Sequence, residues 1–233
     1  MLPKPVRPEY TTTIPSSGKK VKYVPFSVKE EKILILASES QELDEVSNAI
    51  TNVLENCVTT AGFKVQDLAL FDIEYLFLKT RAKSVGEELE VNVTDPNDES
   101  YTVLHKITVD KISVTKNKDH TDTIDMGEGT FIKMKYPGIE FFVEGVALGN
   151  IADRLDLAAK CIQSIVIGED VYNAEEMAEG EAQEWLEGLT SVQFNKVMDF
   201  FITMPRLEHS FTLKNKNTGN NFTIKLEGLQ DFF

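Results

Sequence analysis

The chain has 233 residues, of which 42% are hydrophobic and 27% are charged, which is the composition of an ordinary globular protein and excludes the low-complexity and disordered classes. Its formal net charge of −14 disfavours nucleic-acid binding, because phosphate binding normally requires a basic face that releases counterions. No apolar run approaches the roughly 20 residues that span a bilayer, and the N-terminus lacks the apolar stretch of a signal peptide, so we expect a protein that stays where it is made.

Residues 1–26 are expected to form a proline-rich arm and an N-terminal β-hairpin. Three prolines among residues 1–8 disfavour helix and favour an extended arm. Two β-prone runs, residues 10–14 and 20–24, flank a turn that ends in a glycine. Residues 1–35 hold seven Lys or Arg and three Glu, a net charge of +4. The candidate partner-binding residues of this region are Lys19, Lys20, Lys22 and Phe26.

Residues 27–86 are predicted to be a helical segment. Ser27-Val-Lys-Glu30 is a capping box, in which the hydroxyl and the carboxylate satisfy amide donors at a helix start. A second helix is expected over residues 41–58 and a third over residues 67–82, because apolar residues recur there at spacings of three and four. The third helix is either a core helix, which the pattern favours, or a partner-binding helix.

Residues 87–137 are predicted to be an antiparallel β segment. From Glu88 the apolar residues alternate with polar ones, and the turn Asp95-Pro-Asn-Asp98 separates two such runs, which predicts a hairpin. Further strands are expected over residues 107–114 and 131–136.

Residues 138–205 read as a helical segment and residues 206–233 as a C-terminal β-hairpin with a tail. The helical face runs to Ile165, and a second capping box, Thr190-Ser-Val-Gln193, opens a later helix. Phe232 and Phe233 end the tail and are candidate partner-binding residues. They either dock on a partner or fold back on their own hairpin, which is favoured because terminal aromatic residues usually pack on a nearby core.

These segments predict an α+β protein, since helix and strand blocks are segregated rather than alternating. It would combine helical bundle segments with antiparallel β-hairpins near the N-terminus, in mid-chain and near the C-terminus. We expect one or two compact domains, and the sequence leaves open whether the strands form one sheet or two.

No signature of catalysis, metal binding or a cofactor occurs. Cys57 and Cys161 lie in apolar helical patterns, which favours buried free thiols over a disulfide. The hairpin tips carry no cysteine, so a zinc ribbon is not expected. Asp95, Asn97 and Glu99 have the spacing of the first ligands of a calcium loop but lack its glycine and its twelfth-position glutamate. We therefore predict no catalytic, metal-binding or cofactor-binding residues.

Residues 137–190 hold twelve acidic and two basic residues, a net charge of −10. Such an asymmetry fits docking onto an oppositely charged protein surface, although a solvated face that keeps the protein soluble is the favoured interpretation.

Three stretches of the sequence are informative when taken together: residues 17–32, residues 71–86, and residues 204–209 together with 226–233. They resemble the T4-type bacteriophage baseplate protein family of the baseplate hub and its assembly. The resemblance implies a non-enzymatic structural hub subunit of a contractile-tailed phage, located in the virion and made in the host cytoplasm, which binds other baseplate hub proteins.

The alternative is a cytoplasmic assembly factor for the hub that is not retained in the virion. The sequence leaves open the copy number, the identity of the neighbouring proteins and whether the chain forms a homo-oligomer. Some family members carry cysteine pairs at the hairpin tips, and this chain departs from that pattern, which puts a zinc ion in doubt.

Overall fold

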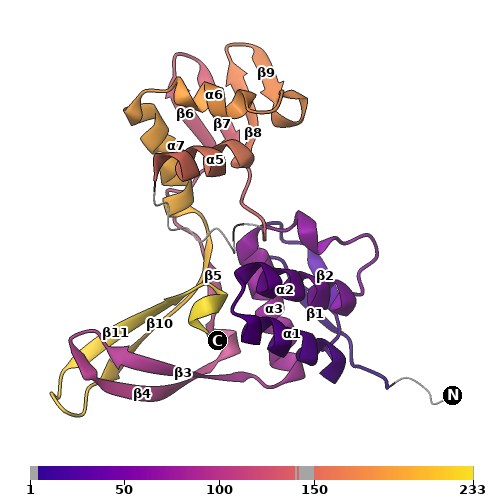
Figure 1. Ribbon diagram of the computed structural model, residues 1–233, viewed down its shortest axis with the longest axis vertical. Coiled ribbons are helices and arrows are strands. Elements are labelled where there is room, and N and C mark those ends of the chain that lie inside the picture. Colours follow the sequence, from indigo (N-terminus) through magenta and orange to yellow (C-terminus); the bar gives the residue numbers. More distant parts are fainter. Residues whose placement is uncertain (1–4, 140, 142–149, 233) are drawn as a thin grey trace. The chain divides into compact units, whose positions relative to one another are not determined.

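The structure is a computed structural model that describes residues 5–139, 141 and 150–232 (Figure 1). The chain divides into two compact units: unit 1 contains residues 1–115 and 206–233, and unit 2 contains residues 116–205. Unit 2 is therefore an insertion, and the expected β segment 87–137 contributes strands to both units. Two strands of unit 1 flank the insertion, β5 (Ser113–Thr115) and β10 (Arg206–Lys214). They pair antiparallel, with Thr115 opposite Arg206, where the chain leaves and re-enters unit 1.

The α+β class is confirmed. The strands of the described residues form several small antiparallel sheets rather than one or two large ones. Hairpins lie near the N-terminus, in mid-chain and near the C-terminus, as the alternating patterns and turn residues predict.

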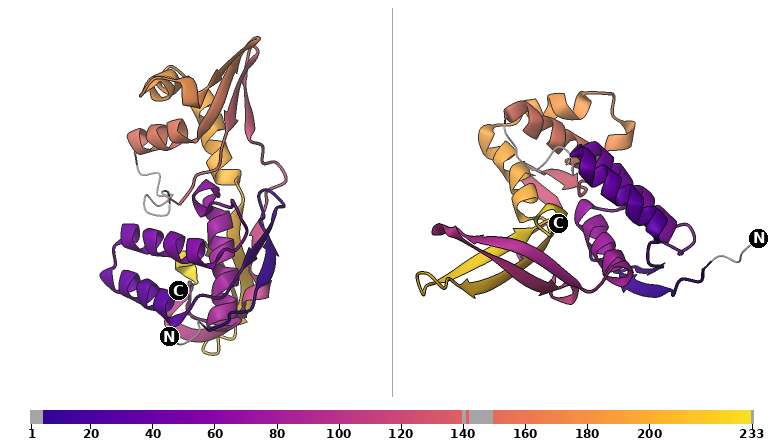
Figure 2. Two further views of the ribbon diagram at one scale, coloured as in Figure 1. Left: turned by 90° about the vertical axis from the view of Figure 1, so that its right-hand side faces the viewer. Right: turned by 60° about the horizontal axis from the view of Figure 1, so that its bottom comes forward.

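Unit 1 places three helices beside the N-terminal hairpin of β1 (Tyr10–Thr13) and β2 (Lys20–Tyr23). Its helices are α1 (Val28–Ser40), α2 (Leu43–Cys57) and α3 (Leu70–Ser84), and α1 packs against α2 (Figure 2). The capping box at the start of α1 is confirmed, because the Ser27 N–H donates to Glu30 Oε2 at 2.8 Å. Asp72 on α3 accepts hydrogen bonds from the backbone N–H and hydroxyl of Ser16, which ties the hairpin turn to this helix.

The second half of unit 1 consists of two long hairpins. One pairs β3 (Glu88–Asp95) with β4 (Asp98–Thr108), and the other pairs β10 with β11 (Asn221–Glu227). Short 3₁₀ turns, η1 (Val65–Asp67), η2 (Val109–Lys111) and η4 (Leu229–Asp231), join or end these elements.

The tips of these two hairpins bind each other through a buried polar cluster. The Asn215 side-chain amide donates to Asp95 Oδ2 at 2.7 Å and to Asp98 Oδ2 at 3.0 Å. Asn215 and Asp95 are buried, at 0% and 3% exposure. Buried polar groups of this kind stabilise a fold only when each has its partner, so the cluster fixes the register of one tip on the other.

Unit 2 is a four-stranded antiparallel sheet with strand order β6-β7-β8-β9. The strands are β6 (Thr123–Gly127), β7 (Thr130–Met134), β8 (Ile162–Ile167) and β9 (Asp170–Asn173). Among its described residues the helices are α5 (Ile151–Cys161), α6 (Glu181–Glu187) and α7 (Ser191–Thr203), with the 3₁₀ turn η3 (Ala174–Glu176) after β9. The helices lie on one face of the sheet (Figure 2), and their apolar residues form a core with Ile132, Met134 and Ile165.

The helical interpretation of residues 138–205 is wrong over its middle part. Helix α5 ends at Cys161, and the next six residues form β8. Ile162 and Ile165 continue the spacing of three that also marks a helix, but this run is rich in β-branched residues, which favour strands, and it pairs with β7. Gly168 then has a φ of +63° in the two-residue turn to β9.

Both cysteines are buried thiols that form no disulfide in the part of the chain that the structure describes, which confirms the prediction from their apolar surroundings. In the part of the chain that the structure describes, no helix is both long and apolar enough to traverse a bilayer.

Candidate docking surfaces

The N-terminal hairpin exposes its lysines because the strand alternates. On β2, Val21 and Tyr23 are buried, whereas Lys20 and Lys22 point to solvent. Lys19 precedes the strand and is also exposed. The structure thus places these three lysines, which the sequence suggested as partner-binding residues, together on one hairpin.

Lys22 differs from the other two lysines because it is already paired. Its Nζ lies 2.9 Å from Glu9 Oε1, and Glu9 Oε2 accepts a hydrogen bond from the Thr59 hydroxyl at 2.8 Å. These two hydrogen bonds lower the pKa of the Glu9 carboxyl. The hairpin therefore offers Lys19 and Lys20, more than Lys22, to a partner of opposite charge.

The aromatic candidates lie in the interior of unit 1. Phe26 is 8% exposed and packs with Val53 and Cys57, and Phe232 is 2% exposed. Phe233 lies outside the described residues. A role for these side chains in partner binding stays a prediction, and for Phe26 and Phe232 it would require them to leave the core.

The C-terminal tail is held by a buried carboxyl of α3. Glu74 is 5% exposed, and its Oε1 accepts a hydrogen bond from the Leu229 N–H at 3.0 Å. Burial raises the pKa of this carboxyl to about 7, although the hydrogen bond opposes the shift. The contact places η4 against α3.

Helix α1 has an exposed apolar surface that was not predicted from the sequence. The buried residues of this helix are Glu30 and Ala37, with Leu34 partly buried against Phe26. These positions form one stripe, so the apolar residues between them must face elsewhere. The exposed set, here called the α1 apolar face, is Val28 at 80%, Ile33 at 37%, Ile35 at 52% and Leu36 at 54%.

The signal for this face was in the sequence. Four consecutive aliphatic residues, 33–36, extend around most of a helix, so one neighbouring helix cannot cover all of them. Adjacent exposed aliphatic residues on a soluble protein mark an interaction site more often than scattered single ones do.

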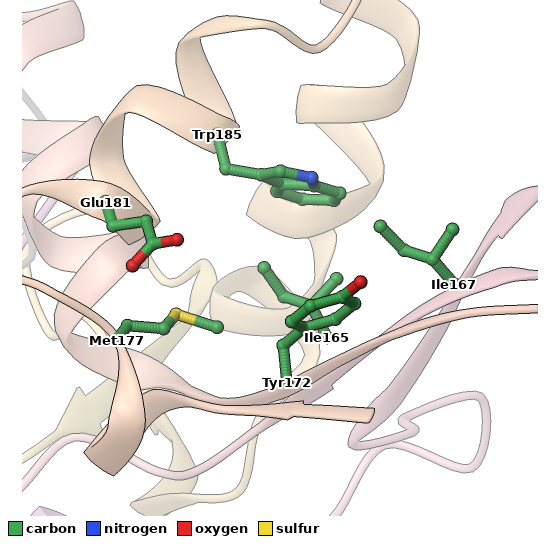
Figure 3. A pocket seen from close by; sticks show the side chains of 6 residues that line it. All are labelled: Ile165, Ile167, Tyr172, Met177, Glu181 and Trp185. Atoms are coloured by element: carbon green, nitrogen blue, oxygen red, sulfur yellow. The ribbon is translucent and has the colours of Figure 1, made fainter. Parts of the chain in front are cut away.

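Unit 2 carries an apolar groove between β8, β9 and α6 (Figure 3). Its lining is Ile165, Ile167, Tyr172, Met177, Glu181 and Trp185, and its volume is about 150 Å³. The Trp185 indole faces Tyr172 and Ile165 across the gap. The Glu181 carboxylate at the margin accepts a hydrogen bond from the Ala178 N–H at 2.8 Å, so its position is fixed.

The imidazole of His120 in unit 2 lies between two hydroxyl groups. Nδ1 of His120 lies 3.0 Å from the Thr203 hydroxyl, and Nε2 lies 2.9 Å from the Tyr136 hydroxyl. Burial lowers the pKa of this imidazole. Among the described residues, no group of three or more His, Cys, Asp or Glu side chains has a geometry that could hold a metal ion.

A family model described as T4 bacteriophage base plate protein matches residues 7–233. No curated protein and no solved structure matches the chain.

Proposed function

The chain belongs to the T4 bacteriophage base plate protein family, and we propose that it is a non-enzymatic structural subunit of the baseplate hub that acts by docking onto other hub proteins. The observation that carries this proposal is the α1 apolar face. Val28, Ile35 and Leu36 are each more than half exposed on one helix, and burying such side chains against a partner is favourable by about 25 cal/mol per Å². A family member with this surface is suited to assembly rather than to chemistry.

Quantitative mass spectrometry of purified virions and of baseplate precursors from infected cells tests the proposal. A structural hub subunit is expected in both samples, at a constant ratio to the other central baseplate proteins. A protein found in the precursors and missing from virions would be an assembly factor, and the structural-subunit proposal would fail.

The contribution of the α1 apolar face is tested separately with the double variant Ile35→Gln/Leu36→Gln. Both side chains are exposed in the isolated protein, so we expect unchanged folding and at least a fivefold loss of incorporation into baseplate precursors. Val192→Gln is the matched control, since Val192 is 72% exposed on α7. Equal incorporation of the double variant and the control would rule out this face as the docking surface.

A further inference from the structure

The groove of unit 2 has an apolar interior with the Glu181 carboxylate at its margin. The segment that forms the groove also carries exposed acidic residues and no basic ones, and these acidic residues are here called the acidic rim. Tyr172 and Ile167, which line it, are 48% and 43% exposed, so the groove is open to a ligand. An apolar cavity of about this volume holds benzene in another protein, so one aliphatic side chain fits. Between residues 161 and 195 the sequence contains no lysine or arginine, and its acidic residues are Glu169, Asp170, Glu175, Glu176, Glu179, Glu181, Glu184 and Glu187.

This combination specifies the chemistry of the occupant. An aliphatic side chain would fill the groove, and a basic residue next to it would face the acidic rim, which favours encounter and orientation. Grooves lined by aromatic residues also accept proline-containing extended segments, because such segments lose little conformational entropy on binding.

The N-terminal arm of this same chain has that chemistry. Residues 1–6 read Met-Leu-Pro-Lys-Pro-Val, with aliphatic residues on either side of Lys4. Val6 is 95% exposed. Arg7 anchors the arm to unit 1, because its Nη1 donates to the Pro25 carbonyl at 3.0 Å and lies 3.8 Å from Glu30 Oε2. Residues 1–6 precede this anchor.

The positions of the prolines suit a strand added at β9. Among the described residues β9 pairs with β8 alone, so its other edge is free of a neighbouring strand. In an extended segment alternate residues direct their N–H groups to the same side. Pro3 and Pro5 would therefore occupy the positions whose N–H side points away from β9, where a missing donor costs nothing. The backbone N–H groups of Leu2, Lys4 and Val6 would point toward β9.

We propose that residues 1–6 of a second copy dock beside β9, with Leu2 in the groove and Lys4 against the acidic rim. The contact would join the basic N-terminal region of one copy to the acidic unit 2 of the next. Such a contact is heterologous, so repetition closes a ring or builds an open chain of copies.

The first experiment measures binding of a synthetic peptide of residues 1–8 to the full chain. Trp185 is the single tryptophan and lines the groove, so its emission reports on occupancy directly. We expect a saturable shift of the emission to shorter wavelength, weakened by added salt. Absence of a shift at millimolar peptide would overturn the proposal.

Variants then locate the contact. Tyr172→Ser in the protein, or Leu2→Ser in the peptide, should weaken binding about tenfold, and Lys4→Glu in the peptide about fivefold at low salt. Val171→Thr is the matched control, because Val171 neighbours Tyr172 on β9, is 57% exposed and does not line the groove. A control that weakens binding as much as Tyr172→Ser would place the contact elsewhere and overturn the assignment.

Sedimentation velocity of the full chain distinguishes a second copy from other arrangements. Self-association is expected at concentrations above the dissociation constant of the peptide, and it should be lost when residues 1–6 are deleted and when Tyr172 is changed to Ser. If the peptide binds but the full chain stays monomeric at those concentrations, the arm occupies the groove of its own chain, and the second-copy proposal fails. None of these outcomes depends on the presence of the protein in virions.

Discussion

Oε1 of Glu74 on α3 accepts a hydrogen bond from the backbone N–H of Leu229, a residue 155 positions later in the chain. The carboxyl is almost fully buried, and burial raises its pKa to about 7 from an ordinary value of 4.5. The C-terminal tail is thus attached to the helices of unit 1 by a group whose charge changes near neutral pH.

This contact makes the stability of unit 1 depend on pH. Below about pH 4.5 the carboxyl is protonated in both the folded and the unfolded state. Between about pH 4.5 and about pH 7 the unfolded state loses its proton while the folded state keeps it, so the free energy of unfolding falls, by about 3 kcal/mol in total. Burial also raises the pKa of Asp72, which adds a change of the same sign.

Glu74→Gln should remove most of this dependence, because the amide oxygen can still accept the Leu229 N–H and does not ionise. Urea unfolding followed by far-UV circular dichroism at about pH 5 and about pH 8 measures the difference. Trp185 fluorescence follows unit 2 in the same samples and serves as the internal control. An identical pH dependence in the wild type and the variant would contradict the assignment to Glu74.

Gly228→Ala should destabilise the attachment of the C-terminal tail to Glu74 on α3. Gly228 has a φ of +69°, and a Cβ atom there would lie 3.1 Å from Glu74 Oε1. Backbone strain and the close contact together should cost about 2 to 3 kcal/mol of unfolding free energy. Gly219→Ala is the control: its φ is +77° and no atom lies within 4 Å of the added Cβ, so it carries the backbone cost alone. Equal losses in the two variants would show that the contact with Glu74 is unimportant.

Asn215→Leu should separate the hairpin tips. The substitution removes the amide that donates to Asp95 and Asp98 and leaves the Asp95 carboxyl buried without this donor. We expect a loss of about 2 to 4 kcal/mol, measured by urea unfolding. Asn220→Ala, an exposed position of the same turn, should change the stability by less than about 0.5 kcal/mol. Comparable stability of the two variants would show that the cluster is dispensable.

Local signals in the sequence predicted the parts of the fold that depend on neighbouring residues. The capping boxes at Ser27 and Thr190 form as expected, because each needs side chains only three positions apart. The hairpins were found from alternation and turn residues for the same reason. The β8 strand was missed because Ile162 and Ile165 fit a helical and a strand pattern alike, and pairing with β7 decides between them.

The candidate surfaces were harder to predict from the sequence than the secondary structure was. The lysines of the N-terminal hairpin were identified, since strand alternation alone exposes them. The groove was not, because Trp185, Tyr172 and Ile165 meet only after α6 packs on the β8–β9 hairpin. The hydrogen bond by which Glu74 holds Leu229 of the tail could not be predicted either, since no local pattern joins residues so far apart in the chain.

Cys57 should resist alkylation while the protein is folded. Burial raises the pKa of its thiol to about 11, so about one molecule in a thousand carries the reactive thiolate at pH 8. Labelling with iodoacetamide at about pH 8, followed by mass spectrometry, should be slow in buffer and complete in concentrated urea. Similar labelling rates in the two solutions would show that the thiol is accessible in the folded chain.

Lys19→Glu/Lys20→Glu should weaken assembly without unfolding the hairpin. Both side chains are exposed, whereas Lys22 is paired with Glu9, so changing Lys22 as well would place two carboxylates side by side within this chain. The double reversal is expected to reduce co-purification with baseplate precursors about tenfold at low salt, with an unchanged circular dichroism spectrum. Lys216→Glu, exposed at the tip of the C-terminal hairpin, is the control for net charge. If both proteins assemble like the wild type, the hairpin lysines have no role in docking; if both are impaired alike, the effect comes from net charge and not from this hairpin.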